Sequence, residues 1–245
     1  MLDYQSILTT EGLISLFTLS LLEIVLGIDN VIFISIVSTK LPKHQQRKAR
    51  TIGLSLALIF RVALLFCISW IVGLKEPLFT LSEFQTTGRD LILMAGGLFL
   101  LIKTTMEIRD KINHIESESS TREGLTLRSA IIQIVFLDII FSFDSILTAV
   151  GLVSNVLLMI IAVVIAMIIM LVFSSYVSDF INKHPTVKML ALAFLLVIGF
   201  VLCAEAIHLH VEKAYIYVAL GFSLFVESLN MAMRSRSHRK VKKNV

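Results

Sequence analysis

Charged residues are scarce in this 245-residue sequence: they make up 16% of it, whereas hydrophobic residues make up 56%. A soluble domain usually has about 25% charged and about 45–50% apolar residues. The composition therefore excludes an ordinary water-soluble globular protein, because the surplus apolar surface would face water. The mean hydropathy of +0.88 indicates that much of this surface faces lipid instead.

Cysteines are also few. Cys67 and Cys203 both fall within apolar segments, so a disulfide framework is excluded by number and by position. The first ten residues contain Asp3 but no Lys or Arg, so no secretory signal peptide is expected. No nucleotide-binding loop is recognisable, which argues against a pump driven by ATP.

Long apolar runs, in contrast, are abundant. Residues 156–173 are eighteen consecutive apolar residues, enough to cross the hydrocarbon core of a bilayer as a helix. Six further segments have a similar character, so we expect an all-α integral membrane protein of about seven transmembrane helices. The expected helices are 12–38, 51–74, 89–108, 129–153, 155–178, 187–207 and 214–233, followed by a basic tail at 234–245.

Lysine and arginine gather on alternate connections between these helices. Eighteen lie on one side of the expected bundle, and three, Lys75, Arg89 and Lys213, lie on the other. Cytoplasmic loops carry the excess of these residues. The amino terminus is therefore expected outside and the carboxyl terminus in the cytoplasm, in a bacterial plasma membrane. We interpret the basic tail as a topology signal and a contact for anionic lipid, and expect no nucleic acid partner.

Two of the expected helices carry the same pattern of polar residues. The matched positions are Glu23, Asp29 and Asn30 in the first helix, and Asp138, Asp144 and Ser145 in the fourth. Because each copy would contain three helices, the second would cross the membrane in the opposite sense. We therefore expect a 3+3 inverted repeat, residues 12–108 and 129–207, plus one extra helix. Such repeats hold their site near the bilayer midplane, between the copies.

The buried polar residues are the candidates for function, because charged groups inside a bilayer are costly. Carboxylate, amide and hydroxyl oxygens suit hard divalent cations such as Mg²⁺, Ca²⁺ and Mn²⁺. The six matched residues are therefore the predicted metal site, with Arg61, Glu227 and Asn230 as accessory candidates. Gly27 is expected to allow a local opening of the first helix that frees backbone carbonyls beside Asp29.

Two features have more than one interpretation at this point. Arg61 is either a counter-charge for the carboxylates when no ion is bound or a member of a permanent ion pair. His208, His210 and Glu212 alternate in the expected outer loop, where a metal-capturing role and a solvated loop both fit the sequence.

The same motifs resemble those of a known family. The run Glu-Ile-Val-Leu-Gly-Ile-Asp-Asn at 23–30 and the run Phe-Asp-Ser at 143–145 are similar to the signatures of the TerC family, named for tellurium resistance. The resemblance covers about Glu11 to Arg234. It implies a seven-helix bundle of the broad lysine-exporter superfamily and a role in metal-ion homeostasis, above all export of manganese. It also implies that the six matched residues form the ion site.

Three functions compete at this stage. Export of a divalent metal ion such as Mn²⁺, with exchange for protons, is the main prediction. Export of a small organic cation such as a basic amino acid would also use buried carboxylates, but it needs a wider pocket and a partner for the substrate's own carboxylate. An intramembrane aspartyl protease is a minor alternative, because the Gly-x-Gly-Asp pattern of presenilin-like enzymes is missing.

We therefore expect a transporter and not an enzyme. No resident cofactor is expected, and the expected partners are membrane lipid and the transported ion. The sequence leaves the oligomeric state open.

The charge asymmetry predicts which loops face the cytoplasm. With both native cysteines replaced by serine, single cysteines at positions 45, 118 and 240 should react with a membrane-impermeant thiol reagent only from the cytoplasmic side. A cysteine at position 80 should react only from outside. Labelling of right-side-out and inverted vesicles measures this, and reaction of positions 45 and 80 from the same side would contradict the seven-helix topology.

Overall fold

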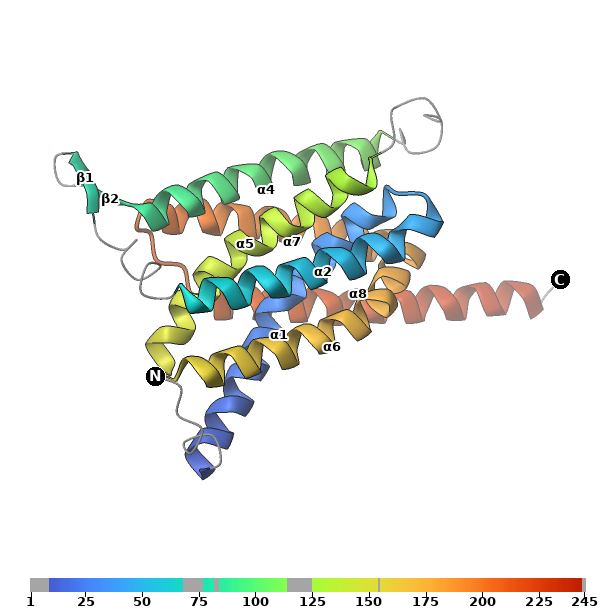
Figure 1. Ribbon diagram of the computed structural model, residues 1–245. Coiled ribbons are helices and arrows are strands. Elements are labelled where there is room, and N and C mark those ends of the chain that lie inside the picture. Colours follow the sequence, from blue (N-terminus) through green and yellow to red (C-terminus); the bar gives the residue numbers. More distant parts are fainter. Residues whose placement is uncertain (1–8, 68–76, 82–83, 114–124, 154, 244–245) are drawn as a thin grey trace.

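Seven long helices dominate the fold (Figure 1). The computed structural model describes residues 9–67, 77–81, 84–113, 125–153 and 155–243. The helices are α1 (Thr10–Thr39), α2 (Lys43–Phe66), α4 (Gly88–Ile112), α5 (Leu127–Leu152), α6 (Val156–Lys183), α7 (Pro185–Ala206) and α8 (Lys213–Lys243). Seven helices in this part of the chain are long and apolar enough to cross a membrane, which confirms the predicted fold class.

A short antiparallel hairpin, β1 (Pro77–Leu81) and β2 (Phe84–Thr87), precedes α4 and was not expected from the sequence. It leads directly into a capping box. The Thr87 hydroxyl accepts a hydrogen bond from the Asp90 backbone N–H at 3.2 Å, and the Asp90 carboxylate accepts one from the Thr87 N–H at 2.8 Å. Such reciprocal bonds satisfy backbone donors that would otherwise lack partners. They fix the first turn of α4, which carries Arg89.

The expected bounds of two helices are wrong. The second helix was expected at 51–74, but α2 runs from Lys43 to Phe66 and so begins eight residues earlier; residues 68–74 of the expected helix lie outside the described residues. It starts directly after Pro42, whose fixed backbone angle suits the position before a helix. The last helix continues to Lys243, through the residues expected as a tail. Apolar composition alone misses basic helical turns, because long basic side chains reach water from a helix that extends past the bilayer.

The packing of the helices follows a simple exchange rule. α4 packs along α7, α1 packs along α6, and α2 packs along α5. If α1, α2 and α4 correspond in order to α5, α6 and α7, exchanging the two sets converts the α1–α6 pair into the α5–α2 pair and leaves α4–α7 unchanged. A two-fold relation between the halves requires this pairing. α8 stands outside the scheme, and its contacts in the bundle are mainly with α7.

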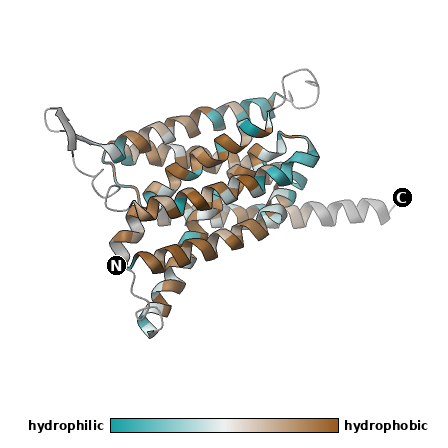
Figure 2. Ribbon diagram, viewed as in Figure 1, coloured by the Kyte–Doolittle hydropathy of each residue, from teal (hydrophilic) through white to brown (hydrophobic). Residues whose placement is uncertain are grey.

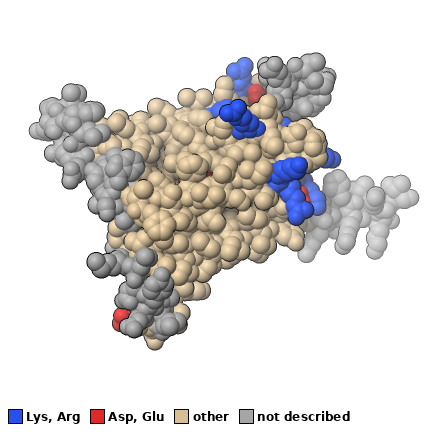
Figure 3. Space-filling view, in the orientation of Figure 1, with Lys and Arg blue, Asp and Glu red and all other residues tan. Residues whose placement is uncertain are grey.

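The two ends of the bundle differ in chemistry. We call the end that carries β1 and β2, the start of α4 and the end of α7 the hairpin end. The opposite end, where α1 turns into α2 and α4 finishes, is the basic end. Hydrophobic residues cover most of the length of the helices, and hydrophilic residues gather at the basic end (Figure 2). Figure 3 shows Lys and Arg side chains grouped there, beside a broad uncharged surface.

Glycines let several helices approach closely. A Cβ added to Gly97 of α4 would lie 2.8 Å from the carbonyl oxygen of Gly199 and 2.6 Å from the sulfur of Cys203, both in α7. A Cβ on Gly27 would overlap the side chain of Met170 in α6. The expected opening of the first helix at Gly27 is therefore wrong, since α1 is one continuous helix there. This glycine provides room for α6 rather than a break.

The close approach of α4 and α7 predicts a selective effect of Gly97→Ala. The added methyl group should push the two helices apart and lower the free energy of unfolding by about 1–3 kcal/mol, as overpacking usually does. Thermal unfolding in detergent measures the loss. Gly221→Ala in α8 is the matched control, because nothing lies within 4 Å of a Cβ there. Equal effects of the two substitutions would contradict this account of the α4–α7 contact.

Candidate functional site

Three charged side chains meet in the interior of the bundle. Arg61 of α2 donates to the Glu23 carboxylate of α1 at 2.6 Å, and to both oxygens of Asp138 of α5 at 3.3 Å. All three side chains are at most 3% exposed. We call Glu23, Arg61 and Asp138 the buried triad. Breaking a buried ion pair by removing one partner is strongly destabilising, so the triad joins α1, α2 and α5.

Two neutral residues donate hydrogen bonds to Asp138 of the buried triad. The Asn30 amide donates to one oxygen of Asp138 at 3.0 Å, and the Ser142 hydroxyl donates to the other at 3.1 Å. Asp138 thus accepts bonds from an arginine, an amide and a hydroxyl. Arg61 has the ion-pair geometry that was one of its two interpretations, and it engages both acids at once.

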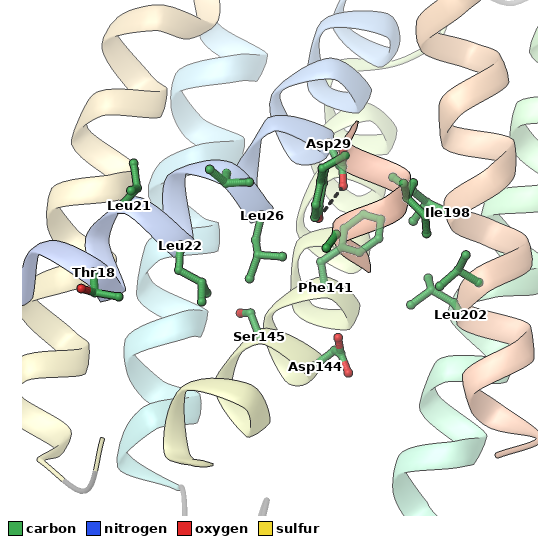
Figure 4. Close-up of a pocket in the computed structure, with 15 residues that line it drawn as sticks. Thr18, Leu21, Leu22, Leu26, Asp29, Phe141, Asp144, Ser145, Ile198 and Leu202 are labelled. Carbon is green, nitrogen blue, oxygen red and sulfur yellow. Dashed lines mark hydrogen bonds between the residues drawn. The ribbon is translucent and has the colours of Figure 1, made fainter. Parts of the chain in front are cut away.

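A cavity of about 500 Å³ opens beside the triad, toward the hairpin end. We call it the hairpin-end cavity. α1, α5, α7 and α8 form its walls. In Figure 4 the leucines of α1 lie on one side and Ile198 and Leu202 of α7 on the other. Asp29, Asp144 and Ser145 also line it, so α1 and α5, the two helices with matched motifs, each contribute a buried carboxylate to one cavity.

A second network of charges surrounds this cavity. Arg89 of α4 donates to Asp144 at 2.9 Å and to Glu205 of α7 at 3.2 Å. The hydroxyl of Tyr217 in α8 donates to Asp29 at 3.4 Å (the dashed line in Figure 4). Each carboxylate is less than a tenth exposed, whereas the Arg89 side chain is 25% exposed. The acids are therefore fixed and buried, and their cation lies nearer the surface.

The structure divides the six predicted ligands into two groups. Glu23 and Asp138 belong to the buried triad, together with Asn30, whereas Asp29, Asp144 and Ser145 line the cavity. Among the described residues, no three His, Cys, Asp or Glu side chains are close enough together to hold a metal ion. In this conformation, Arg61 lies between the two acids of the first group, and Arg89 pairs with Asp144 of the second group and with Glu205.

Of the three accessory candidates, Arg61 belongs to the buried triad, and the other two lie elsewhere. Glu227 of α8 accepts a hydrogen bond from Thr186, at the start of α7, and a second from Asn230 at 3.4 Å. This group lies toward the basic end and does not line the hairpin-end cavity. Of the three residues in the expected outer loop, His208 contacts the capping carboxylate of Asp90 at 3.0 Å.

Three residues of the cavity network were not predicted as site residues. Arg89 was counted only as a loop charge, and Glu205 and Tyr217 were not named among the candidates. The spacing of Glu205 relative to Glu107 was a usable signal, because both acids end similar apolar runs. Nothing comparable in the sequence brings Arg89 of α4 or Tyr217 of α8 to these acids, since both reach them through packing between distant helices.

Comparison with known protein families agrees with the resemblance that the two motifs indicate. A family model described as the integral membrane protein TerC family matches residues 8–242. This chain belongs to the TerC family. A UPF0053 protein of Haemophilus influenzae is 47% identical to the TerC-family chain over 232 residues, which cover 94% of this chain and 98% of that relative. No solved structure matches the chain.

Two relatives from Escherichia coli strain K12 show the range of lengths. The UPF0053 inner membrane protein YgdQ is 49% identical over 224 residues, which cover 91% of this chain and 94% of YgdQ. The UPF0053 inner membrane protein YoaE is 49% identical over 220 residues, which cover 89% of this chain but only 42% of YoaE. With its seven apolar helices, this TerC-family chain is a multi-pass membrane protein.

The buried triad predicts that Arg61 is essential for stability. Arg61→Met leaves Glu23 and Asp138 buried without a counter-charge and should lower the free energy of unfolding by about 3–5 kcal/mol. Unfolding in detergent measures this loss. Arg89→Met should cost less, because Arg89 is partly exposed.

A triple variant separates charge from packing in the triad. Combining Arg61→Met with Glu23→Gln and Asp138→Asn removes every charge and should recover much of the stability. An Arg61→Met protein as stable as the wild type would show that the triad is not a structural ion pair.

Proposed function

We propose that this TerC-family protein is a secondary transporter of cations, with a divalent metal ion, Mn²⁺ first, as its substrate. The observation that carries the proposal is that Asp29 and Asp144, one from each repeat, are both buried and both line a single cavity. Intramembrane acids that face a cavity mark ion pathways far more often than they serve packing alone. Ser145 adds a hydroxyl oxygen to the same wall.

The balance of charge around the cavity favours a cation. Three carboxylates, Asp29, Asp144 and Glu205, stand against one guanidinium, Arg89, which leaves a formal surplus of two negative charges. A divalent ion matches this surplus. It would compete with Arg89 for Asp144, and the partial exposure of Arg89 leaves that side chain free to swing toward the hairpin end. Cation binding and movement of Arg89 are then linked.

The proposed coupling ion for metal transport is the proton. Carboxylates that share a low-dielectric site resist all being charged together, so the metal-free site should retain a proton. A metal ion needs deprotonated ligands and expels that proton. Metal affinity should therefore fall as the pH falls, and outward metal movement can be driven by inward proton movement. From the excess of Lys and Arg we propose that the basic end faces the cytoplasm and that the hairpin-end cavity faces the outer side.

Two observations favour a second candidate, a small organic cation such as a basic amino acid. The cavity volume of about 500 Å³ far exceeds that of a metal ion, and its walls are mostly apolar. Arg89 also offers the partner that the substrate's carboxylate would need. Competition for Mn²⁺ transport by basic amino acids, compared with competition by Mg²⁺, Ca²⁺ and Zn²⁺, separates the two substrates.

The proposal predicts unequal effects of substitutions in the cavity and in the outer loop. Asp29→Asn and Asp144→Asn should abolish Mn²⁺ transport into vesicles of known orientation while the protein still inserts, because each removes a charge that the ion needs. His210→Ala should change transport little, since water can replace a loop histidine. Full transport by Asp144→Asn would contradict the proposed site.

The pH dependence of binding provides the matching equilibrium test. Mn²⁺ affinity in detergent should rise between about pH 5.5 and 8.5, with protons released on binding. The Asp144→Asn variant should bind weakly and lose most of this dependence. A flat profile with no proton release would contradict proton exchange while leaving the metal site itself intact.

A further inference from the structure

A second cavity opens at the basic end. It has a volume of about 320 Å³ and is lined by α1, α4, α5 and α7. We call it the basic-end cavity. Its polar residues include Thr104 and Glu107 of α4 and Gln133 of α5. Nothing in the proposed function so far uses it, although it shares three helices with the hairpin-end cavity.

A buried carboxylate in this cavity pairs with a more exposed cation. The Glu107 side chain is 9% exposed and forms an ion pair with Lys40, whose side chain is 41% exposed. The pair resembles the one at the other end, where the buried Glu205 pairs with the partly exposed Arg89. Glu107 and Glu205 lie on α4 and α7, the two helices that the exchange of repeats leaves paired. Each end of the bundle thus has a buried acid covered by a more exposed base.

The two cavities come within a few helical turns of each other. On α1 the hairpin-end cavity reaches Asp29 and the basic-end cavity begins at Phe33, which is about 6 Å further along the axis at 1.5 Å per residue. On α7 the corresponding step from Ile198 to Leu195 is about 4.5 Å. On α5, from Phe141 to Gln133, it is about 12 Å.

An oxygen ligand is buried in this intervening layer. Asn30 lies between Asp29 and Phe33 on α1 and is 4% exposed. Its amide nitrogen binds Asp138, but its carbonyl oxygen accepts no hydrogen bond from any side chain or backbone group in the described residues. A buried polar atom without a partner is costly, and a passing cation would provide that partner.

We infer that the basic-end cavity is a second cation site, the cytoplasmic vestibule of the transport path, and that the Lys40–Glu107 ion pair closes it. The inference rests on the proposed function and extends it to a named access route. A cation reaches Glu107 when Lys40 swings into solvent. It then passes the Asn30 carbonyl to Asp29 and Asp144.

Basic residues at the rim do not oppose this route. Lys103 and Arg109 also line the cavity, but both are exposed, whereas Glu107 is buried. At physiological ionic strength, exposed charges are largely screened beyond about 8 Å, and buried charges are screened much less. The carboxylate at the floor of the cavity therefore dominates the selection of ions inside it.

Cysteine reactivity tests the vestibule without any transport assay. Thr104→Cys is introduced into the full chain with Cys67→Ser and Cys203→Ser, and labelling rates with cationic and anionic methanethiosulfonates of similar size are compared in detergent at physiological salt. Lys40→Met should raise the rate of the cationic reagent about fivefold, the effect of losing one partly exposed ion pair. Lys43→Met, at an exposed residue outside the cavity lining, is the matched control and should leave the rate within about twofold.

Substitution of the carboxylate completes the experiment. Glu107→Gln should lower the ratio of cationic to anionic labelling about fivefold. The exchange Lys40→Glu with Glu107→Lys should restore slow labelling if the two residues act as a pair. Unchanged rates in Lys40→Met and an unchanged ratio in Glu107→Gln would overturn the inference, as would a Thr104→Cys that reacts in neither background.

A separate variant distinguishes this result from a failure of the proposed function. Asp144→Asn should leave the labelling ratio at Thr104→Cys unchanged while it abolishes Mn²⁺ transport. If Mn²⁺ is not transported by the wild type but the labelling results hold, the proposed function fails and the cation-selective vestibule stands. If transport requires Asp144 but labelling ignores Lys40 and Glu107, the inference fails and the proposed function stands.

Discussion

The ion pairs of the Arg61 guanidinium are the interactions on which the rest of the interior depends. It holds two carboxylates, Glu23 of α1 and Asp138 of α5, in a region where neither has access to water. Such an arrangement is stable only while all three charges remain together. It therefore fixes α1 against α5. With these two helices held together, Asp29 of α1 and Asp144 of α5 line the same cavity. The acids of the buried triad and the acids that line the cavity are separate.

This separation could be predicted only in part from the sequence. Long apolar runs identified all seven helices, and the matched motifs identified the four central acids. The sequence could not show which of those acids form structural ion pairs and which line the site. Arg61 fits the sequence equally well as a counter-ion and as a fixed partner. Arg89 and Tyr217 were missed for a related reason: they reach Asp144 and Asp29 by packing from α4 and α8, and no local pattern reports such contacts. Helix ends were misjudged where charge replaces apolarity, as in the first turns of α2.

Glycine residues in this fold allow helices to approach closely and do not break them. Gly27 was expected to open the first helix, yet both Gly27 and Gly97 lie in continuous helices and allow a neighbouring helix to approach. Small residues at helix interfaces allow backbone contact in membranes, where lipid competes for apolar surface. The α4–α7 contact at Gly97 and Gly199 brings together the two helices that carry Glu107 and Glu205. The ends of the proposed path are thus connected by a rigid pair.

The position of α8 has a consequence of its own. This helix has no counterpart among the other six long helices, and it contributes Tyr217 to the wall of the hairpin-end cavity, whereas none of its described residues lines the basic-end cavity. Two halves related by a two-fold axis would make the inward-open and outward-open forms equal in free energy. A wall present at only one end removes that equality. In the proposed transporter, the resting population would then be biased toward one form, and the bias would depend on contacts such as that between Tyr217 and Asp29.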